Sequence, residues 1–170
     1  LPMSDVKINT ATISETAGNW FISVQVEMEI DDPAVPTGQA IGVDLGIKSL
    51  AVVSDGTTFD NPKTLTKYEK RMSRLQRELH RRVKGSSNRA KTKAKIAKLH
   101  AKITNTRKHS LHNISRHVTA KTKPIAVVVE DLNVKGMLKN GKLSKAISDA
   151  SFGELRRQIE YKAQWNGVNV

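Results

Sequence analysis

Two acidic side chains lie within or directly after apolar runs, where a charge is costly unless a partner compensates it. Asp44 interrupts the run IGVDLGIKSLAVV, residues 41–53, and Glu130 follows the run AVVV, residues 126–129. Both runs have the character of β-strands. If the two strands are parallel neighbours, which lie about 4.8 Å apart, the two carboxylates converge at one site.

Carboxylates this close repel each other unless a cation or a proton lies between them. Their oxygens favour Mg²⁺ or Mn²⁺, and two such ions about 3.5–4 Å apart promote phosphodiester hydrolysis. We therefore predict that Asp44 and Glu130 are the catalytic residues and metal ligands of a nuclease. Gly42 and Gly46 beside Asp44 are expected to leave room for a large substrate. The simpler interpretation is a strand-end carboxylate that accepts hydrogen bonds from backbone amides.

The other acidic residues considered, and the histidines, are expected to have structural roles or to lie at the surface. Asp55, with Gly56, is expected to form a hairpin turn, Asp131 a turn after the strand, and Asp149 a loop before the last helix. The five histidines do not form a predicted site. His109 and His112 are three residues apart on a helix without a neighbouring acid, and we expect them at the surface.

The composition is that of a folded basic protein. The chain has 170 residues, a formal net charge of +13 and 38% hydrophobic residues, which favours an anionic polymer as partner. The absence of cysteine excludes disulfides and thiolate metal sites in this chain. No stretch approaches the roughly 18 consecutive apolar residues of a membrane span, and no signal segment opens the sequence. We therefore expect an intracellular, soluble protein.

The basic residues are concentrated in one segment. Residues 63–123 contain 20 of the 29 Lys and Arg but only two of the 16 acids, a local net charge of +18. Asn61 and Pro62 are expected to open a first helix and Asn88 to cap a second. Apolar residues recur three and four positions apart, which predicts a helix–helix seam; they are Leu65, Tyr68, Met72, Leu75 and Leu79, then Ile96, Leu99, Ile103, Leu111, Ile114 and Val118.

The outer faces of this antiparallel helical hairpin carry the charge. Because acids that could pair with them are almost absent, like-charge repulsion weakens the helices unless phosphates relieve it. With 4% aromatic residues, we expect contacts to the nucleic-acid backbone rather than stacking on bases. The predicted nucleic-acid-binding residues are Arg71, Arg74, Arg77, Arg81, Arg82, Lys84, Arg89, Lys91, Lys95, Lys98 and Lys102.

Further strands and one helix surround these elements. Residues 20–30 alternate strictly, which predicts a strand with a buried face that includes Trp20 and Ile30. It follows a weaker strand and the turn TAGN, and it precedes a Pro- and Gly-containing linker at 31–39. Ser151 and Glu154 have the spacing of a capping box. The helix after it is expected to end at Gly167 and to bury an apolar face made of Phe152, Leu155, Ile159 and Ala163. Trp165 is expected in the core with Phe152, and the alternative is that these helix-end aromatics brace the metal site.

Three consecutive segments resemble the TnpB family of insertion-sequence proteins, which are related to type V CRISPR effectors. IGVDLGIKSLAVVSDG resembles the first RuvC motif, AVVVEDLNVKGM the second, and SFGELRRQIEYKAQWNGVNV the helix and strand after it. The segment between the first two resembles the family's basic helical insertion, and ISETAGNWFISVQVEME the last strands of its wedge domain.

The order of elements predicts an α/β fold: an RNase H-like mixed sheet with a long basic helical-hairpin insertion, preceded by a β-hairpin. In the terms of the family, residues 1–38 are the end of a β-barrel wedge domain plus linker. Residues 39–170 are an incomplete RuvC nuclease domain with an insertion at 62–122. The first two acids of the RuvC site fall on Asp44 and Glu130.

The resemblance implies a transposon-encoded, RNA-guided DNA endonuclease with DNA, guide RNA and Mg²⁺ or Mn²⁺ as partners, in the prokaryotic cytoplasm at the nucleoid. The third acid and a zinc ribbon are expected outside this chain, so we expect the chain alone to be inactive. Three alternatives stay open: a non-catalytic RNA- or DNA-binding accessory module of transposition, a guide-independent RuvC-type resolvase, and an actin-like ATPase or sugar kinase, whose first phosphate-binding strand IGVDLG also resembles.

Overall fold

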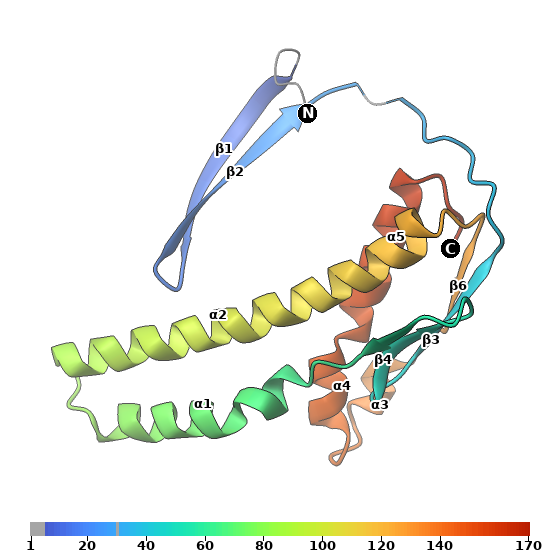
Figure 1. Cartoon of the computed structure of the whole chain (residues 1–170). Coiled ribbons are helices and arrows are strands. Elements are labelled where there is room, and N and C mark those ends of the chain that lie inside the picture. Colours follow the sequence, from blue (N-terminus) through green and yellow to red (C-terminus); the bar gives the residue numbers. More distant parts are fainter. Residues whose placement is uncertain (1–5, 30) are drawn as a thin grey trace. The chain divides into compact units, whose positions relative to one another are not determined.

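A computed structural model describes residues 6–29 and 31–170 (Figure 1). The chain divides into two compact units. One consists of Leu1–Asp32 and Glu69–Lys102, and the other of Pro33–Tyr68 and Ile103–Val170. The second unit contains the sheet that carries both predicted catalytic acids.

The sheet of the second unit is mixed, as predicted for an α/β protein. Its strands are β3 (Ile41–Leu45), β4 (Ser49–Val53), β5 (Thr58–Asp60) and β6 (Val127–Val129), in the order β5-β4-β3-β6. The β3–β4 and β4–β5 pairs are antiparallel, whereas β3 and β6 are parallel. A parallel bridge between Ala126 and Asn169 extends the pairing to the segment expected to begin another strand.

One face of this sheet is buried and the other is open. The alternate residues Ile41, Val43 and Leu45 of β3 are buried, and they join a core formed with the helices of the same unit. On the opposite face Val52 is 40% exposed and Val128 is 65% exposed. This one-sided burial explains the alternating pattern of β3 and places Asp44 on the open face.

Four helical elements supply the other side of the core: the end of α2 (Ser87–Arg116), the π-helix η2 (His117–Lys121), α4 (Ser144–Ala150) and α5 (Phe152–Trp165). A short helix, α3 (Val134–Met137), precedes α4. The predicted apolar faces are confirmed, because Leu111, Ile114 and Leu155 are fully enclosed and Phe152 is 2% exposed. Trp165 is not a core residue, since it is 71% exposed at the end of α5.

The helical hairpin is formed by α1 (Thr64–Arg81) and α2. Leu75 and Leu99 are buried in its seam, as the spacing predicts. The ends differ from the prediction. The side chain of Asn61 accepts a hydrogen bond from the Lys63 amide, and α1 begins at Thr64 rather than at the predicted Pro62. At α2 the hydroxyl of Ser86, not Asn88, accepts a hydrogen bond from the first turn.

The predicted capping box of α5 is absent from the structure. Ser151 has the left-handed conformation with φ of 55° and makes no side-chain cap. Its hydroxyl donates instead to the carbonyl of Ser148, one turn back in α4. Glu154 pairs with Arg157. Ser151 is therefore the corner between two helices, a role that its local sequence does not distinguish from a cap.

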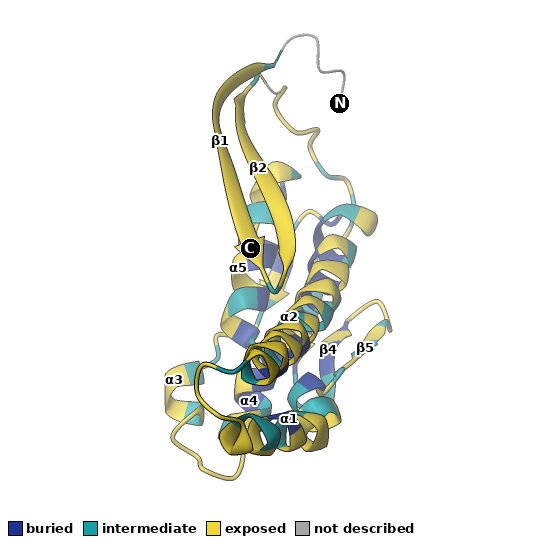
Figure 2. Ribbon diagram, turned by 90° about the vertical axis from the view of Figure 1, so that its left-hand side faces the viewer, coloured by how far each residue is buried: buried dark blue, intermediate teal, exposed yellow. Residues whose placement is uncertain are grey.

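The β-hairpin consists of β1 (Lys7–Thr16) and β2 (Asn19–Glu27), antiparallel around the predicted turn. The prediction of a buried face is wrong. Every residue of both strands is exposed (Figure 2), and Trp20 is 71% exposed. Two strands alone cannot enclose a core. The predicted strand residue Ile30 lies outside the described residues.

Among the residues that the structure describes, no helix combines the length and the apolar character needed to cross a bilayer.

Candidate functional site

The predicted parallel pairing of the strands beside Asp44 and Glu130 is confirmed by the sheet register. In the parallel β3–β6 pair, Gly42 is opposite Val128 and Val43 is opposite Val129. Asp44 and Glu130 each occupy the next position along the chain, and both side chains are exposed. Parallel neighbours in this register bring the two carboxylates to the same edge of the sheet.

Both acids line one open pocket of about 540 Å³. Its floor is the open face of the sheet, where Val52, Val128 and Gly42 lie. Gly42 borders this space, because a Cβ there would have Ser54 Cβ, at 4.0 Å, as its nearest neighbour. Gly46 has a different role from the one predicted. A Cβ at Gly46 would lie 2.9 Å from the carbonyl oxygen of Ser49, so the tight connection between β3 and β4 requires glycine.

The carboxylates of Asp44 and Glu130 suit a hard divalent cation, but two side chains are few ligands for one. Two carboxylates provide oxygen ligands of the kind that Mg²⁺ and Mn²⁺ prefer. Because both side chains are exposed, placing a cation between them requires little desolvation. Within residues 6–29 and 31–170, no cluster of three or more His, Cys, Asp or Glu side chains is placed to hold a metal ion. Among the described residues, the two acids alone therefore do not complete a metal site.

The other acids have structural roles. Asp131 is 88% exposed and pairs with Arg156 of α5. Asp55 forms the turn between β4 and β5, as predicted, and accepts a hydrogen bond from the Thr57 amide. It also pairs with His117 at 3.0 Å. The hydrogen bond with His117, followed by the one from Thr57, lowers the pKa of Asp55 to about 2.

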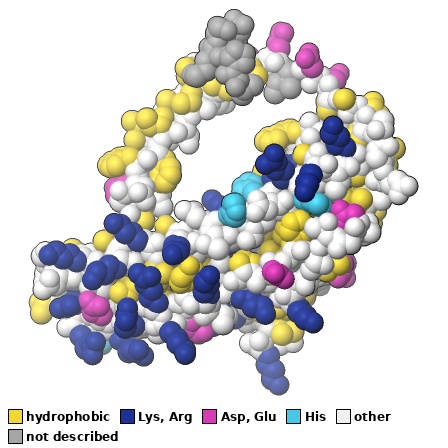
Figure 3. Space-filling view, viewed as in Figure 1, with side chains coloured by type: hydrophobic (Ala, Val, Ile, Leu, Met, Phe, Trp, Pro, Cys, Tyr) yellow, Lys and Arg dark blue, Asp and Glu magenta, His cyan; other side chains and the backbone are white. Residues whose placement is uncertain are grey.

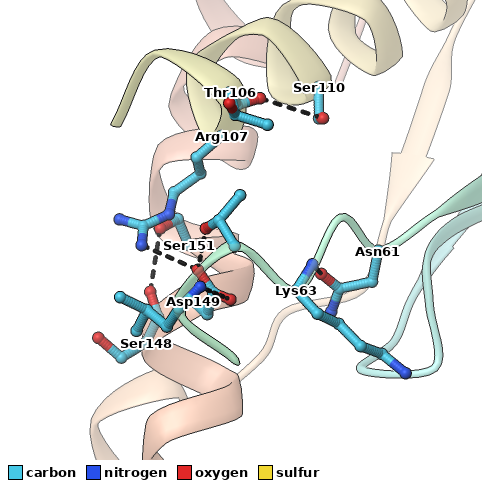
Figure 4. A network of polar contacts seen from close by, with 10 residues as sticks. Asn61, Lys63, Thr106, Arg107, Ser110, Ser148, Asp149 and Ser151 are labelled. Atoms are coloured by element: carbon cyan, nitrogen blue, oxygen red, sulfur yellow. Dashed lines mark hydrogen bonds and ion pairs between the residues drawn. The ribbon is translucent and has the colours of Figure 1, made fainter. Parts of the chain in front are cut away.

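Asp149 is the acid whose role the sequence did not predict (Figure 4). It lies in α4, not in a loop, and its side chain is 6% exposed. One carboxylate oxygen accepts hydrogen bonds from the Thr64 hydroxyl at 2.5 Å and from Arg107 at 2.9 Å, and the other accepts from the Leu65 amide at 2.9 Å. A residue 85 positions away from Thr64 thus caps α1 and joins it to α2 and α4.

The predicted basic residues line the outer surface of the helical hairpin. Dark blue side chains gather along α1 and α2 in Figure 3. Each of the predicted residues is exposed except Arg89, which is half-buried. Arg82 pairs with Glu78 at 3.0 Å. The guanidinium of Arg89 donates to the carbonyls of Leu79 and Arg82, so it also satisfies the C-terminal end of α1.

His109 and His112 are exposed, as expected, and do not pair with each other. The His109 ring contacts Asn113, and the His112 ring contacts Lys162 of α5. Burial, followed by the positive charge of Lys162, lowers the pKa of His112. The ring is thereby favoured in its neutral form.

Residues 23–141 match the family model OrfB_IS605, described as "Probable transposase". A Streptomyces pristinaespiralis protein named "Putative RNA-guided DNA endonuclease" is 44% identical over 159 residues, which cover 93% of this chain and 39% of the relative. "Putative RNA-guided DNA endonuclease InsQ" of Escherichia coli (strain K12) is 37% identical over 179 residues, which cover 96% of this chain and 44% of the relative. The chain thus spans about two fifths of the length of these relatives.

Among solved structures, the fold is similar to a protein in the cryo-EM structure of the Cas12f1–sgRNA–target DNA complex. The TM-score is 0.52 at 18% sequence identity, over 88% of this chain and 31% of that chain.

Proposed function

Because the chain belongs to the TnpB family, whose model is described as "Probable transposase", we propose that it is part of an RNA-guided DNA endonuclease. The names of its relatives support this activity, with DNA and a guide RNA as partners. The match extends over more than nine tenths of the chain but under half of each relative. The activity therefore belongs to a longer protein of which this chain represents a part.

We place the reaction at Asp44 and Glu130, as the first two acids of a RuvC-type site on an RNase H-like sheet. The observation that carries the proposal is their adjacent register at the open edge of β3 and β6. A divalent cation, Mg²⁺ or Mn²⁺, held there supplies Lewis-acid stabilisation of the phosphodiester and an activated water. The two carboxylates hold and orient the cation, and the open space beside Gly42 admits the DNA backbone.

The helical hairpin supplies electrostatic attraction for nucleic acid in this proposal. Its exposed cations greatly outnumber the acids, and the hydrogen bonds from Arg82 and Thr92 engage Glu78, whose pKa they lower. With Glu69 and Glu78 as the only acids in residues 63–123, most of the positive charge of this segment is not neutralised within it. Contacts to phosphates are the physical means of relieving that repulsion.

Cleavage by the full-length protein with its guide RNA tests the assignment. We expect Asp44→Asn and Glu130→Gln each to reduce the rate of DNA cleavage by at least about a hundred-fold, since a missing metal ligand removes several kcal/mol of transition-state stabilisation. Binding of guide RNA should be retained. Asp131→Asn is the matched control, because Asp131 adjoins Glu130 but pairs with Arg156. Cleavage at the wild-type rate by Asp44→Asn would refute the assignment.

A second candidate is a non-catalytic nucleic-acid-binding module. It is favoured by one observation: among the described residues, no third ligand accompanies the two acids. The same assay separates the candidates, because a non-catalytic module would leave DNA cleavage unchanged in both variants. Cleavage without guide RNA would instead indicate a guide-independent resolvase.

A further inference from the structure

Two adjoining pockets flank Ala120 in the π-helix η2, on the unit that carries the sheet. One has a volume of about 400 Å³ and is lined by Trp165, Lys123 and the segment Pro33–Thr37, among others. The other has a volume of about 480 Å³ and is lined by Phe59, Arg116, His117 and Lys121, among others. Ala120 lines both. π-Helical turns occur frequently at functional sites.

The first pocket has an exposed aromatic wall. Trp165 is 71% exposed although it lies on the helix whose opposite face forms the core. The ring of Tyr161, one turn earlier, meets it edge to face, with the ring centroids 4.7 Å apart and an interplanar angle of 67°. Arg157, another turn earlier, lies over the Tyr161 ring at 5.4 Å. The indole is therefore braced from one side and open on the other.

The second pocket is cationic. Neither Arg116 nor Lys121, nor Lys123 of the first pocket, is ion-paired with an acid in the part of the chain that the structure describes. Asp55 faces this region, but His117 pairs with it at 3.0 Å. Arg116 also lies near Lys162, and burial followed by the charge of Arg116 lowers the pKa of Lys162. Arg116 and Lys121 of the pocket thus lie in a region of positive charge, an arrangement that an anion relieves.

We propose that these two pockets bind one unpaired nucleotide of a single-stranded nucleic acid, with the base stacked on Trp165 and the phosphate held by Arg116 and Lys121. Aromatic platforms beside cations are the recurring means of binding single strands. A pocket of about 400 Å³ also falls within the range of about 300–1,000 Å³ common to small-ligand sites. The class of ligand rests on the proposed function. The site itself is separate from Asp44 and Glu130 and from the predicted basic residues of the hairpin.

Tryptophan fluorescence tests the stacking contact directly. The chain contains two tryptophans, so Trp20→Phe leaves Trp165 as the only one. We expect a short single-stranded oligonucleotide to quench its emission, and a duplex of the same length to quench it much less. Parallel titrations with RNA and DNA single strands identify which of the two is the preferred source of the base.

Affinity measurements by fluorescence anisotropy of a labelled oligonucleotide complete the test. We expect Trp165→Leu to raise Kd about 5- to 150-fold, the effect of removing one base-stacking interaction. Trp20→Leu is the matched control, because Trp20 is equally exposed at 71%, and it should leave Kd unchanged. Arg116→Gln with Lys121→Gln should reduce the salt dependence of binding while stacking, and thus the quenching at saturation, remains. Far-UV circular dichroism verifies that each variant is folded.

The outcomes are distinguishable. If the oligonucleotide binds without any change in Trp165 emission, and Trp165→Leu binds as tightly as the parent, the stacking site is refuted while the nucleic-acid partner of the proposed function stands. If no oligonucleotide binds in the anisotropy assay, both this site and the proposed nucleic-acid partner are refuted.

Discussion

At the scale of single residues, Asp44 is exposed although the residues next to it in the sequence are apolar. The run around it is buried on one face only, and Asp44 lies on the other. Its carboxylate therefore remains in contact with water, and no protein partner is needed to offset the cost of burying a charge. Its position near Glu130, at the end of the β3–β6 pair, is the basis of the cation site that we propose, because neighbouring exposed carboxylates attract a cation at little desolvation cost.

Asp149 is a contrasting acid, since it is buried and has three partners. Asp149→Ala removes the cap of α1 and leaves the guanidinium of Arg107, which is 24% exposed, without its carboxylate. Breaking a buried pair of this kind costs about 3 kcal/mol. We expect that decrease in the free energy of unfolding measured with urea by circular dichroism.

Asp131→Ala is the control for this substitution, because the Asp131–Arg156 pair is exposed. The midpoint of its unfolding curve should remain near that of the parent. Equal destabilisation by the two substitutions would show that Asp149 does not join α1, α2 and α4 in the way described.

Acid sensitivity follows from Glu154. Hydrogen bonds from Arg157, followed by that from Gln158, lower the pKa of Glu154 from 4.5 to about 2. A lowered carboxyl pKa stabilises the fold above the ordinary value, and the contribution is lost as pH falls through the folded value. We expect the free energy of unfolding to decrease between about pH 4.5 and about pH 2, and Glu154→Gln to decrease less over this range. An identical pH dependence in parent and variant would contradict the role of these hydrogen bonds.

At the scale of secondary-structure elements, the spacing of apolar residues predicted which face of an α-helix or of a core strand is buried. The predicted apolar stripe on α2 is buried, and the predicted parallel strands β3 and β6 pair in the structure. Both predictions depend on apolar faces that are removed from water when the chain folds. Helix ends were predicted less well. Thr64 is capped by Asp149, 85 residues away, and no local pattern encodes such a contact. Trp20 was assigned to a core from the strict alternation of residues 20–30, and Trp165 from its place at the end of a helix with an apolar face, but both are exposed.

The basic residues of the helical hairpin lead to a prediction about the salt dependence of nucleic-acid binding. Replacing Arg71, Arg74 and Arg77 by Gln should weaken nucleic-acid binding and flatten its salt dependence. The log–log slope should fall by about 0.7–0.9 for each phosphate that the variant no longer neutralises. Gln preserves helix propensity, so α1 should remain folded. The measurement is Kd as a function of salt concentration.

A triple Gln variant at Lys135, Lys139 and Lys142 changes the net charge equally outside α1 and α2. It should retain the parental slope. If the hairpin variant has the same slope as this control, the basic face of α1 is solvated and does not contact phosphates.

At the scale of the whole molecule, the chain combines two neighbouring exposed carboxylates, a strongly basic hairpin and an aromatic pocket. The relatives are named putative RNA-guided DNA endonucleases, and nucleic-acid cleavage is the function that we propose for these features. Two carboxylates balance only half of the charge of two divalent cations, so we expect metal binding by this chain to be weak. The parallel pairing of β3 with β6, which brings the two acids to neighbouring positions, could be predicted from the sequence because both strands are apolar runs.

Paramagnetic broadening by Mn²⁺ tests the central claim most directly, and a chain of 18.8 kDa is well suited to nuclear magnetic resonance. The account predicts that Mn²⁺ broadens the amide signals around Asp44 and around Glu130 together, at the same metal concentration. It also predicts that Asp44→Asn or Glu130→Gln abolishes both effects. Broadening around only one of the two acids, or around neither at concentrations that broaden other carboxylates, would contradict it.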